Sequence, residues 1–241
     1  SARNVGMDAA RGKYVIFPDP DDWVELGYVS QMVELQNYYQ TDLLCVGYYV
    51  DTDEKCVPAN EGQKPNCMDR VTAQQALLIP PKMGGFAWNK LYHLDIIREH
   101  KLRFLDDVGT TEDLEFAFHY LKYCDTVCFV PSTRLYHYYQ RSGAATHSEF
   151  SIKKMETIRT YEKIIESSEN DKLVQAAKEE ICNTAINLIW QYQNSNLQDK
   201  AALKKLQRYA RCYLKDYLKI MNLSCTMTVR CKTGSESVCQ F

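Results

Sequence analysis

The chain has 241 residues, of which 45% are hydrophobic and 25% are charged, the balance of an ordinary folded protein with a sizeable core. Its formal net charge of −2 gives no overall attraction to nucleic acid, so we expect no nucleic-acid partner. No apolar run is long enough to span a bilayer, and no signal peptide is visible. Together these features predict a cytoplasmic protein.

Ten cysteines are scattered along the chain, and none forms a Cys-x-x-Cys pair. Their spacing argues against a zinc ribbon and against a thioredoxin-like redox site. Several lie inside apolar runs, where a free cysteine behaves as a small hydrophobic residue. We therefore expect reduced thiols and a reducing compartment.

The first elements alternate between helix and strand. A short helix over residues 2–12 is expected to end at Gly12, and the β-prone run Tyr14–Phe17 leads into the acidic turn Asp19–Asp22. Apolar residues at helical spacing predict a helix over 24–39, and a buried strand over 43–50 follows it.

The middle of the chain continues this alternation less regularly. Residues 51–69 read as a loop or ragged hairpin, 72–79 as a helix, 86–92 as an aromatic strand behind two glycines, and 95–100 as a short helix. A helix over 114–123 opens on an acidic pair, and strands are predicted at 127–131 and 135–139.

From residue 151 onward the pattern changes to three long helices, at about 151–168, 171–193 and 199–222. We therefore predict an α/β domain over 1–150, a helical extension over 151–222 and a tail over 223–241. The α/β part would be an open sheet flanked by helices, which binds its ligands at the carboxyl edge of the strands.

Two acidic sites stand out in the α/β half. Asp19, Asp21 and Asp22 repel one another unless a cation lies between them, and hard divalent ions prefer such oxygen ligands. The alternative is a polar turn that caps the next helix. Glu112 and Asp113 open a helix, where they either compensate the helix dipole or include a general base. One metal-binding cluster and one separate base suit transfer of a group from a phosphorylated donor to an alcohol.

Four segments, in this order and rough spacing, resemble the family 2 nucleotide-sugar glycosyltransferases, and the resemblance covers about residues 1–150. The segments are the run from Ala2 to Trp23 with its Asp-x-Asp-Asp turn, Trp88-Asn89-Lys90-Leu91-Tyr92, Glu112-Asp113-Leu114 with Phe116, and Leu135-Tyr136-His137-Tyr138 with Arg141 and Gly143.

The resemblance implies a partial GT-A (Rossmann-like) mixed sheet and an inverting sugar transfer in polysaccharide or glycan biosynthesis. The donor would be a nucleotide-diphosphate sugar, by family habit UDP-linked, and the acceptor a saccharide or lipid-linked glycan. Mn²⁺ or Mg²⁺ would be held by Asp21 first, with Asp19 and Asp22 as ligands or ribose contacts and His137 as a further ligand. Asp113, beside Glu112, would be the catalytic base.

Further residues take roles from the same resemblance. Arg3 and Asn4 would lie near the donor nucleotide, and Arg141 would neutralise the leaving diphosphate. Trp88 would form an apolar platform for a sugar ring, with Asn89 and Lys90 bonded to acceptor or phosphate. Each has a plain alternative: N-terminal packing for the first pair, a solvated loop arginine, and a core tryptophan.

Two features lie outside this assignment. The helix over 201–220 carries six lysines and arginines against one acid, so it could rest on an anionic membrane at the inner face or pack on its neighbours with a solvated basic face. The family's strand-turn-helix-strand unit for the nucleotide base would precede Ser1, so the chain reads as a fragment.

Two other functions stay open from the sequence. The first is a non-catalytic relative that uses the Trp88 groove to hold glycan or a partner enzyme. The second is a nucleotidyl or phosphoryl transferase, although the sequence lacks a Gly-rich phosphate loop followed by Lys-Ser/Thr.

Overall fold

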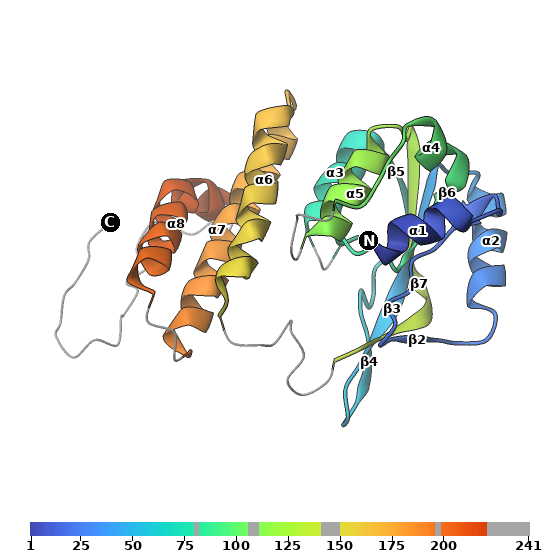
Figure 1. The fold of residues 1–241 in the computed structure, drawn as a ribbon, viewed down its shortest axis with the longest axis horizontal. Helices are drawn as coiled ribbons and strands as arrows, with labels where there is room; N and C mark the ends of the chain where they lie inside the picture. The colour runs from blue at the N-terminus through green and yellow to red at the C-terminus, as the bar shows by residue number, and fades with distance from the viewer. Residues whose placement is uncertain (80–81, 106–110, 141–149, 196–198, 221–241) are drawn as a thin grey trace.

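A computed structural model describes residues 1–79, 82–105, 111–140, 150–195 and 199–220, with the side chains of residues 216 and 218–220 not described. A mixed sheet with helices on both faces forms one half of the molecule, and an array of three long helices forms the other (Figure 1). The expected α/β class with a C-terminal helical extension is confirmed. The tail over 223–241 and Arg141 lie outside the described residues.

The sheet is built around two long neighbouring strands, β3 (Leu43–Asp51) and β7 (Thr126–Tyr139), which run parallel. The strand order is β1-β6-β3-β7-β2, with β4 beside β3 and β5 beside β7, and the other described pairs are antiparallel. The shorter strands are β1 (Tyr14–Val15), β2 (Trp23–Val24), β4 (Cys56–Pro58), β5 (Asn66–Asp69) and β6 (Lys90–His93).

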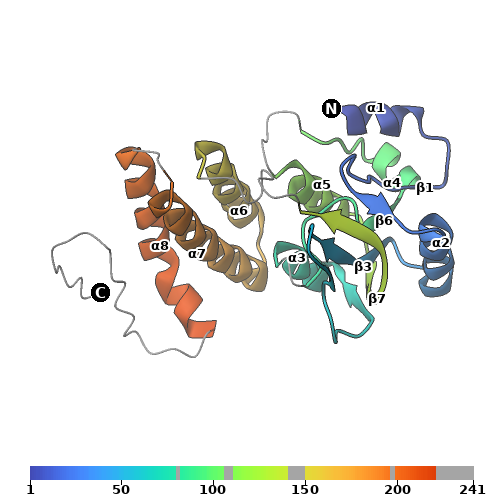
Figure 2. The ribbon, with the colours of Figure 1, turned by 90° about the horizontal axis from the view of Figure 1, so that it is seen from below.

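Alternate residues of the central strands enter two different cores, as the period of a strand requires. Leu43, Cys45 and Val127 face the helices α3 (Arg70–Leu78) and α5 (Glu112–Leu121). Leu44 and Val46 face the helix α2 (Tyr28–Tyr39), together with Trp88 and Tyr136. Figure 2 shows α3 and α5 on one side of the sheet and α2 on the other.

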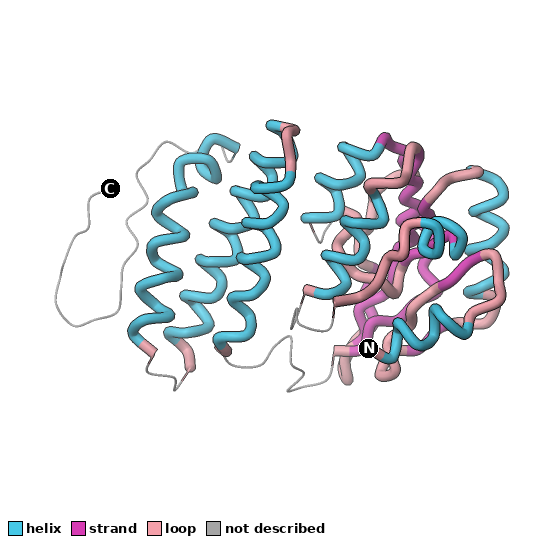
Figure 3. Tube along the Cα trace, turned by 45° about the horizontal axis from the view of Figure 1, so that its top comes forward, coloured by secondary structure: helices cyan, strands magenta, loops and turns pink. Residues whose placement is uncertain are grey.

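The three long helices lie beside α3 and α5, on the side away from the sheet (Figure 3). One apolar core cluster includes residues from Met7 to Leu206 and so extends into these helices. Lys163 Nζ donates to Glu115 Oε1 over 2.7 Å, which joins the extension to α5. The remaining helices are α1 (Ala2–Ala9), α4 (Leu94–Glu99), the 3₁₀ turn η1 (Ile152–Met155), α6 (Glu156–Ser167), α7 (Asp171–Gln193) and α8 (Lys200–Ile220).

Helix α8 buries its apolar side against the protein. Ala202 and Leu206 belong to the core, whereas Lys204, Lys205 and Arg208 are exposed. An interfacial helix would need that apolar side for lipid. Within the described ranges, no helix is both long enough and apolar enough to cross a membrane.

Three local expectations differ from the structure. The two strands predicted at 127–131 and 135–139 form one strand, β7, with irregular register around Gly47 of β3. The segment 51–69 supplies β4 and β5, and the aromatic strand shrinks to β6. Helix α3 is capped by Asp69, whose side chain accepts from Thr72 N.

The expectation of free thiols is wrong for one pair. Cys67 of β5 lies directly opposite Cys128 of β7, and the two form a disulfide. The pairing was not visible from the spacing because the two residues are 61 positions apart. Cys45, Cys56, Cys124, Cys182 and Cys212 are free.

Candidate active site

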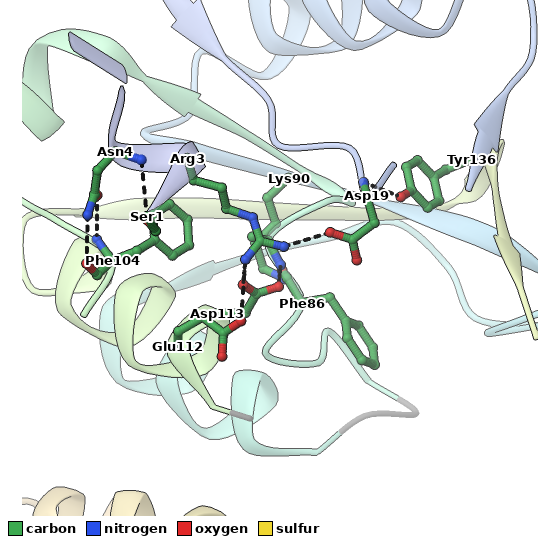
Figure 4. Close-up of polar contacts among 11 residues, drawn as sticks. Ser1, Arg3, Asn4, Asp19, Phe86, Lys90, Phe104, Glu112, Asp113 and Tyr136 are labelled. Atoms are coloured by element: carbon green, nitrogen blue, oxygen red, sulfur yellow. Dashed lines mark hydrogen bonds and ion pairs between the residues drawn. The ribbon is translucent and has the colours of Figure 1, made fainter. Parts of the chain in front are cut away.

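The guanidinium of Arg3 joins the two acidic sites. Its Nη2 donates to Asp19 Oδ1 over 2.6 Å and its Nη1 donates to Asp113 Oδ1 over 2.7 Å, with Glu112 Oε1 at 3.5 Å from Nη1 (Figure 4). Asp19 follows strand β1, whereas Asp113 lies in the first turn of α5, so one arginine brings together residues far apart in sequence. The predicted metal turn and the predicted base therefore lie at one site.

Asp113 has the environment of a general base. Its side chain is 21% exposed, and burial raises its pKa to about 6, while the charge of Arg3 and the bond from Ala87 N act in the opposite direction. Ala87 N donates to Asp113 Oδ2 over 3.1 Å. A carboxylate with a pKa near 6 is ionised at neutral pH and is a stronger base than an exposed aspartate.

Gly85 lets the loop before β6 come close enough for this contact. A Cβ atom at Gly85 would lie 2.8 Å from a methyl carbon of Leu114 and 3.2 Å from its Cα. Because that is closer than real Cβ contacts, any larger residue would push the loop away from α5. The backbone amide of Ala87, two residues later, would then move away from Asp113.

Lys90 and Asn89 hold the same loop from beneath. Lys90 is fully buried, and its ammonium donates to Gly84 O (2.7 Å), Phe86 O (2.6 Å) and Asn89 Oδ1 (2.9 Å). Asn89 Nδ2 in turn donates to Val46 O over 3.1 Å. Both side chains form hydrogen bonds within the protein, and both shape the loop that carries Ala87.

Trp88 lies in the core, and this placement corrects the expectation of a sugar platform. Only 2% of its surface is exposed, because its ring stacks between Phe86 and Tyr136 at centroid distances of 4.8 and 4.5 Å. The groove that a non-catalytic relative was expected to form around Trp88 is therefore filled by aromatic side chains of the protein itself.

The acidic turn is fastened to β7 by Tyr136. The Tyr136 hydroxyl donates to Asp22 Oδ2 over 2.6 Å and accepts from Asp19 N at 3.0 Å. Tyr139 N donates to Asp22 Oδ1 over 2.9 Å. Burial raises the pKa of Asp22, and these two hydrogen bonds oppose that effect. Tyr136 received no role from the sequence, although it lies inside the motif Leu135–Tyr138, next to the expected ligand His137.

The carboxylates of the turn suit Mn²⁺ or Mg²⁺ by their chemistry. Asp21 is exposed and, among the described residues, makes no hydrogen bond or ion pair, and only one oxygen of Asp19 is bonded to Arg3. Hard divalent ions take one or two protein carboxylates and complete their shell with water and phosphate oxygens. Asp21 and Asp19 would hold such an ion, while Asp22 is occupied by Tyr136 and Tyr139.

The remaining predicted residues lie elsewhere. His137 contacts Asp51, Glu25 and Cys56, so the structure does not bring it together with the turn 19–22. Asn4 exchanges two hydrogen bonds with the backbone of Phe104, at 2.9 and 3.0 Å, which fixes α1 to the segment before α5. The polar groups of both residues already have partners within the protein, and the role predicted for Asn4 stays a prediction.

The sequence is similar to known glycosyltransferases. Residues 1–100 match the model of glycosyl transferase family 2. The putative glycosyltransferase EpsH of Bacillus subtilis (strain 168) is 33% identical over 142 residues, which are 57% of this chain and 40% of that protein. The glycosyltransferase GlyA of Streptococcus pneumoniae serotype 4 is 30% identical over 117 residues, 45% of this chain and 16% of GlyA. The chain thus spans less than half the length of these relatives.

The fold is also found in solved structures. Residues 1–349 of S. aureus TarS in complex with UDP-GlcNAc align with a TM-score of 0.56 at 14% identity, covering 91% of this chain and 70% of that one. The complex with UDP aligns with a TM-score of 0.56 at 13% identity, covering 95% and 73%. The partial GT-A fold is confirmed, and the similarity to glycosyl transferase family 2 is carried by residues 1–100.

Proposed function

We propose that this chain is the catalytic part of an inverting glycosyltransferase that moves a sugar from a UDP-linked donor to a saccharide or lipid-linked glycan hydroxyl. The observation that carries the proposal is the bridge from Asp19 through Arg3 to Asp113. Through Arg3, a turn suited to a metal-bound diphosphate lies close to Asp113, whose pKa is raised to about 6, a value suited to a general base. The family match of residues 1–100 supports the same reaction class.

In the proposed reaction, Asp113 accepts the proton of the acceptor hydroxyl as its oxygen attacks the anomeric carbon of the donor. The bond from that carbon to the diphosphate oxygen breaks, and the electron pair leaves with UDP. Attack from the side opposite the leaving group inverts the anomeric configuration. Ala87 N and Arg3 hold the two oxygens of Asp113, so the carboxylate is oriented before the acceptor arrives.

Asp21 and Asp19 would hold Mn²⁺ or Mg²⁺, which supplies positive charge to the leaving diphosphate. Arg3 supplies a second, permanent positive charge beside Asp19. UDP is proposed as the nucleotide because TarS, which shares the fold, was crystallised with UDP-GlcNAc and with UDP. The exposed lysines of α8 would let the protein rest at an anionic inner membrane surface near a lipid-linked acceptor, in polysaccharide or glycan biosynthesis.

Turnover of UDP-GlcNAc and of other UDP-sugars with Mn²⁺ or Mg²⁺ tests the proposal, with release of UDP as the readout. Asp113→Asn and Asp21→Ala should each abolish most turnover, and chelation of the metal should do the same. Asp95→Asn is the matched control, because Asp95 is an exposed acid in the first turn of α4. The anomeric configuration of the product from an α-linked donor should be β.

Binding of UDP-sugar without turnover, under all these conditions, would favour a non-catalytic module instead. Unchanged turnover in both Asp113→Asn and Asp21→Ala would overturn the assignment of the site. A product that retains the donor configuration would leave the family assignment intact but overturn direct displacement.

A further inference from the structure

A second group of chemically active side chains lies on the other face of β7. Side chains alternate along a strand, so Tyr136 faces the acidic turn while His137 faces away from it. Registered neighbours place Trp23 of β2 and Tyr49 of β3 opposite His137. Asp51 lies two residues after Tyr49, on the same face, and Cys56 of β4 is its registered partner. Four adjacent strands thus gather these side chains on one face.

The atoms of this group are close enough to share one ion. Ligand atoms of Asp51, Cys56 and His137 all lie within 4.8 Å of one another. Asp51 Oδ2 is 2.9 Å from His137 Nδ1, and Cys56 Sγ is 3.9 Å from the same nitrogen. Ligands around a tetrahedral Zn²⁺ lie on the order of 3–4 Å apart, given bonds of about 2.0–2.3 Å.

Both ring nitrogens of His137 lie beside carboxylates. Its Nε2 lies 3.3 Å from Glu25 Oε1 and its Nδ1 2.9 Å from Asp51 Oδ2. A neutral imidazole has one N–H, so it donates to one carboxylate and presents a lone pair to the other. A histidine that binds metal through one nitrogen usually donates its other N–H to a carboxylate, and Glu25 is placed for that bond.

The Asp51 carboxylate gives independent support for a bound cation, because one of its oxygens has no hydrogen-bond partner. Asp51 is 8% exposed, and its Oδ1 is buried with no hydrogen-bond partner. Its other oxygen accepts from Trp23 Nε1 over 3.1 Å. Leaving a buried carboxylate oxygen unpaired is costly, and ligation of a cation would satisfy it.

We propose that Asp51, Cys56 and His137 form a binding site for a borderline divalent transition metal, with Zn²⁺ as the best match. The thiolate and imidazole favour zinc over Mg²⁺ or Mn²⁺, which prefer oxygen. Three protein ligands leave a fourth position for water. Binding replaces the thiol proton of Cys56, which is released to solvent, and Glu25 orients the imidazole from outside the ligand set.

This site is separate from the proposed diphosphate metal. Asp19 and Asp22 contact the Tyr136 hydroxyl, whereas the new ligands surround His137 on the opposite face. The Cys56 thiol itself is no activated nucleophile, because its hydrogen bond to Asp51 raises its pKa to about 11. The inference therefore does not rest on the proposed transferase activity.

Titration of the metal-free full chain with Co²⁺ and then Zn²⁺ tests the site. We expect one equivalent of Co²⁺ to give the near-ultraviolet absorption of a cobalt–thiolate bond, and one equivalent of Zn²⁺ to displace it. Cys56→Ser should remove the absorption, and Asp51→Asn should weaken Zn²⁺ binding at least 10-fold, the size of effect that even an outer partner of a metal site gives.

Cys212→Ser is the matched control, since Cys212 is also a free, exposed cysteine, and it should keep the absorption. Asp21→Ala should keep it as well, which separates this site from the diphosphate metal. Absence of the absorption in the unaltered chain would overturn the proposal. Persistence of the absorption in Cys56→Ser would equally overturn it, because another cysteine would then be the ligand.

Discussion

Two clusters of carboxylates, one joined by Arg3 and one around His137, are stabilised in different ways. In the first cluster, Asp19 lies beside the Tyr136 hydroxyl and shares the permanent positive charge of Arg3 with Asp113 of α5. In the cluster around His137, neither Asp51 nor Glu25 forms an ion pair with a lysine or arginine among the described residues, and an imidazole and a thiol stand nearby. A fixed guanidinium suits a site that must admit an anion, whereas neutral donors beside carboxylates suit a site that takes up a cation.

Asp113, the proposed base, gives the largest expected effect. Asp113→Asn keeps the shape of the side chain but removes its ability to accept a proton, so turnover should fall by about 100- to 10,000-fold. The corresponding change in the cluster around His137, Asp51→Asn, should leave turnover within a few-fold of the unaltered chain, because that carboxylate is no part of the proposed reaction. Initial rates of UDP release compare the two variants, and similar losses in both would break the distinction.

Burial of Asp113 should also be visible in stability. Because its pKa is raised from 3.8 to about 6, its contribution is present in full below pH 3.8 and is lost as pH rises through 6. That difference corresponds to about 3 kcal/mol of unfolding free energy at most. Denaturant unfolding should be measured between pH 3 and 7 for the unaltered chain and for Asp113→Asn. The difference in unfolding free energy between the two proteins should change by up to this amount. A constant difference would contradict the raised pKa.

Arg3 should set the pH at which the base becomes active. Its charge lowers the pKa of Asp113, so Arg3→Gln should raise that pKa above 6 and move the acid limb of turnover upward by on the order of one pH unit. The pH profile of kcat gives the shift. Arg11→Gln, at an exposed position just after α1, is the control and should leave the limb in place. An unmoved limb in Arg3→Gln would mean that another group titrates.

Tyr136 should give the smallest effect. Tyr136→Phe keeps the ring stacked on Trp88 but loses the hydroxyl that bonds both Asp22 and the backbone of Asp19. A lost hydrogen bond of this kind is worth about 1 kcal/mol, or roughly a 5-fold loss in turnover. Tyr14→Phe is the control on the same sheet. If Tyr136→Phe has full activity at every concentration of Mn²⁺, the turn is positioned by its own backbone.

The helices and strands were predicted from the sequence better than the contacts between residues. Apolar periodicity located the helices and the buried strand β3, because core formation imposes that period. It split β7 into two strands, at 127–131 and 135–139, where the structure has one. The strand nevertheless continues, with irregular pairing at Gly47 of β3, where a Cβ would lie 2.2 Å from Pro131 O.

The acidic residues of the site were predicted from the sequence, but the contacts that join them were not. Asp19 and Asp113 were identified by resemblance, but the Arg3 bond between them spans 110 positions, and nothing local specifies it. Trp88 looked like a ligand platform because sequence shows the residue type and not the Phe86 and Tyr136 rings that bury it. Asp51 and Cys56 were overlooked because the hairpin between β3 and β4 had no clear period.

The contact of Gly85 with Leu114 has an evolutionary consequence. Since the loop touches α5 where a Cβ would collide with both the side chain and the Cα of Leu114, a smaller residue at 114 relieves only part of the clash. A lineage that gained a side chain at this position would also have to shift the start of the helix that carries Asp113. Substitution of Gly85 should therefore be coupled to loss of Asp113.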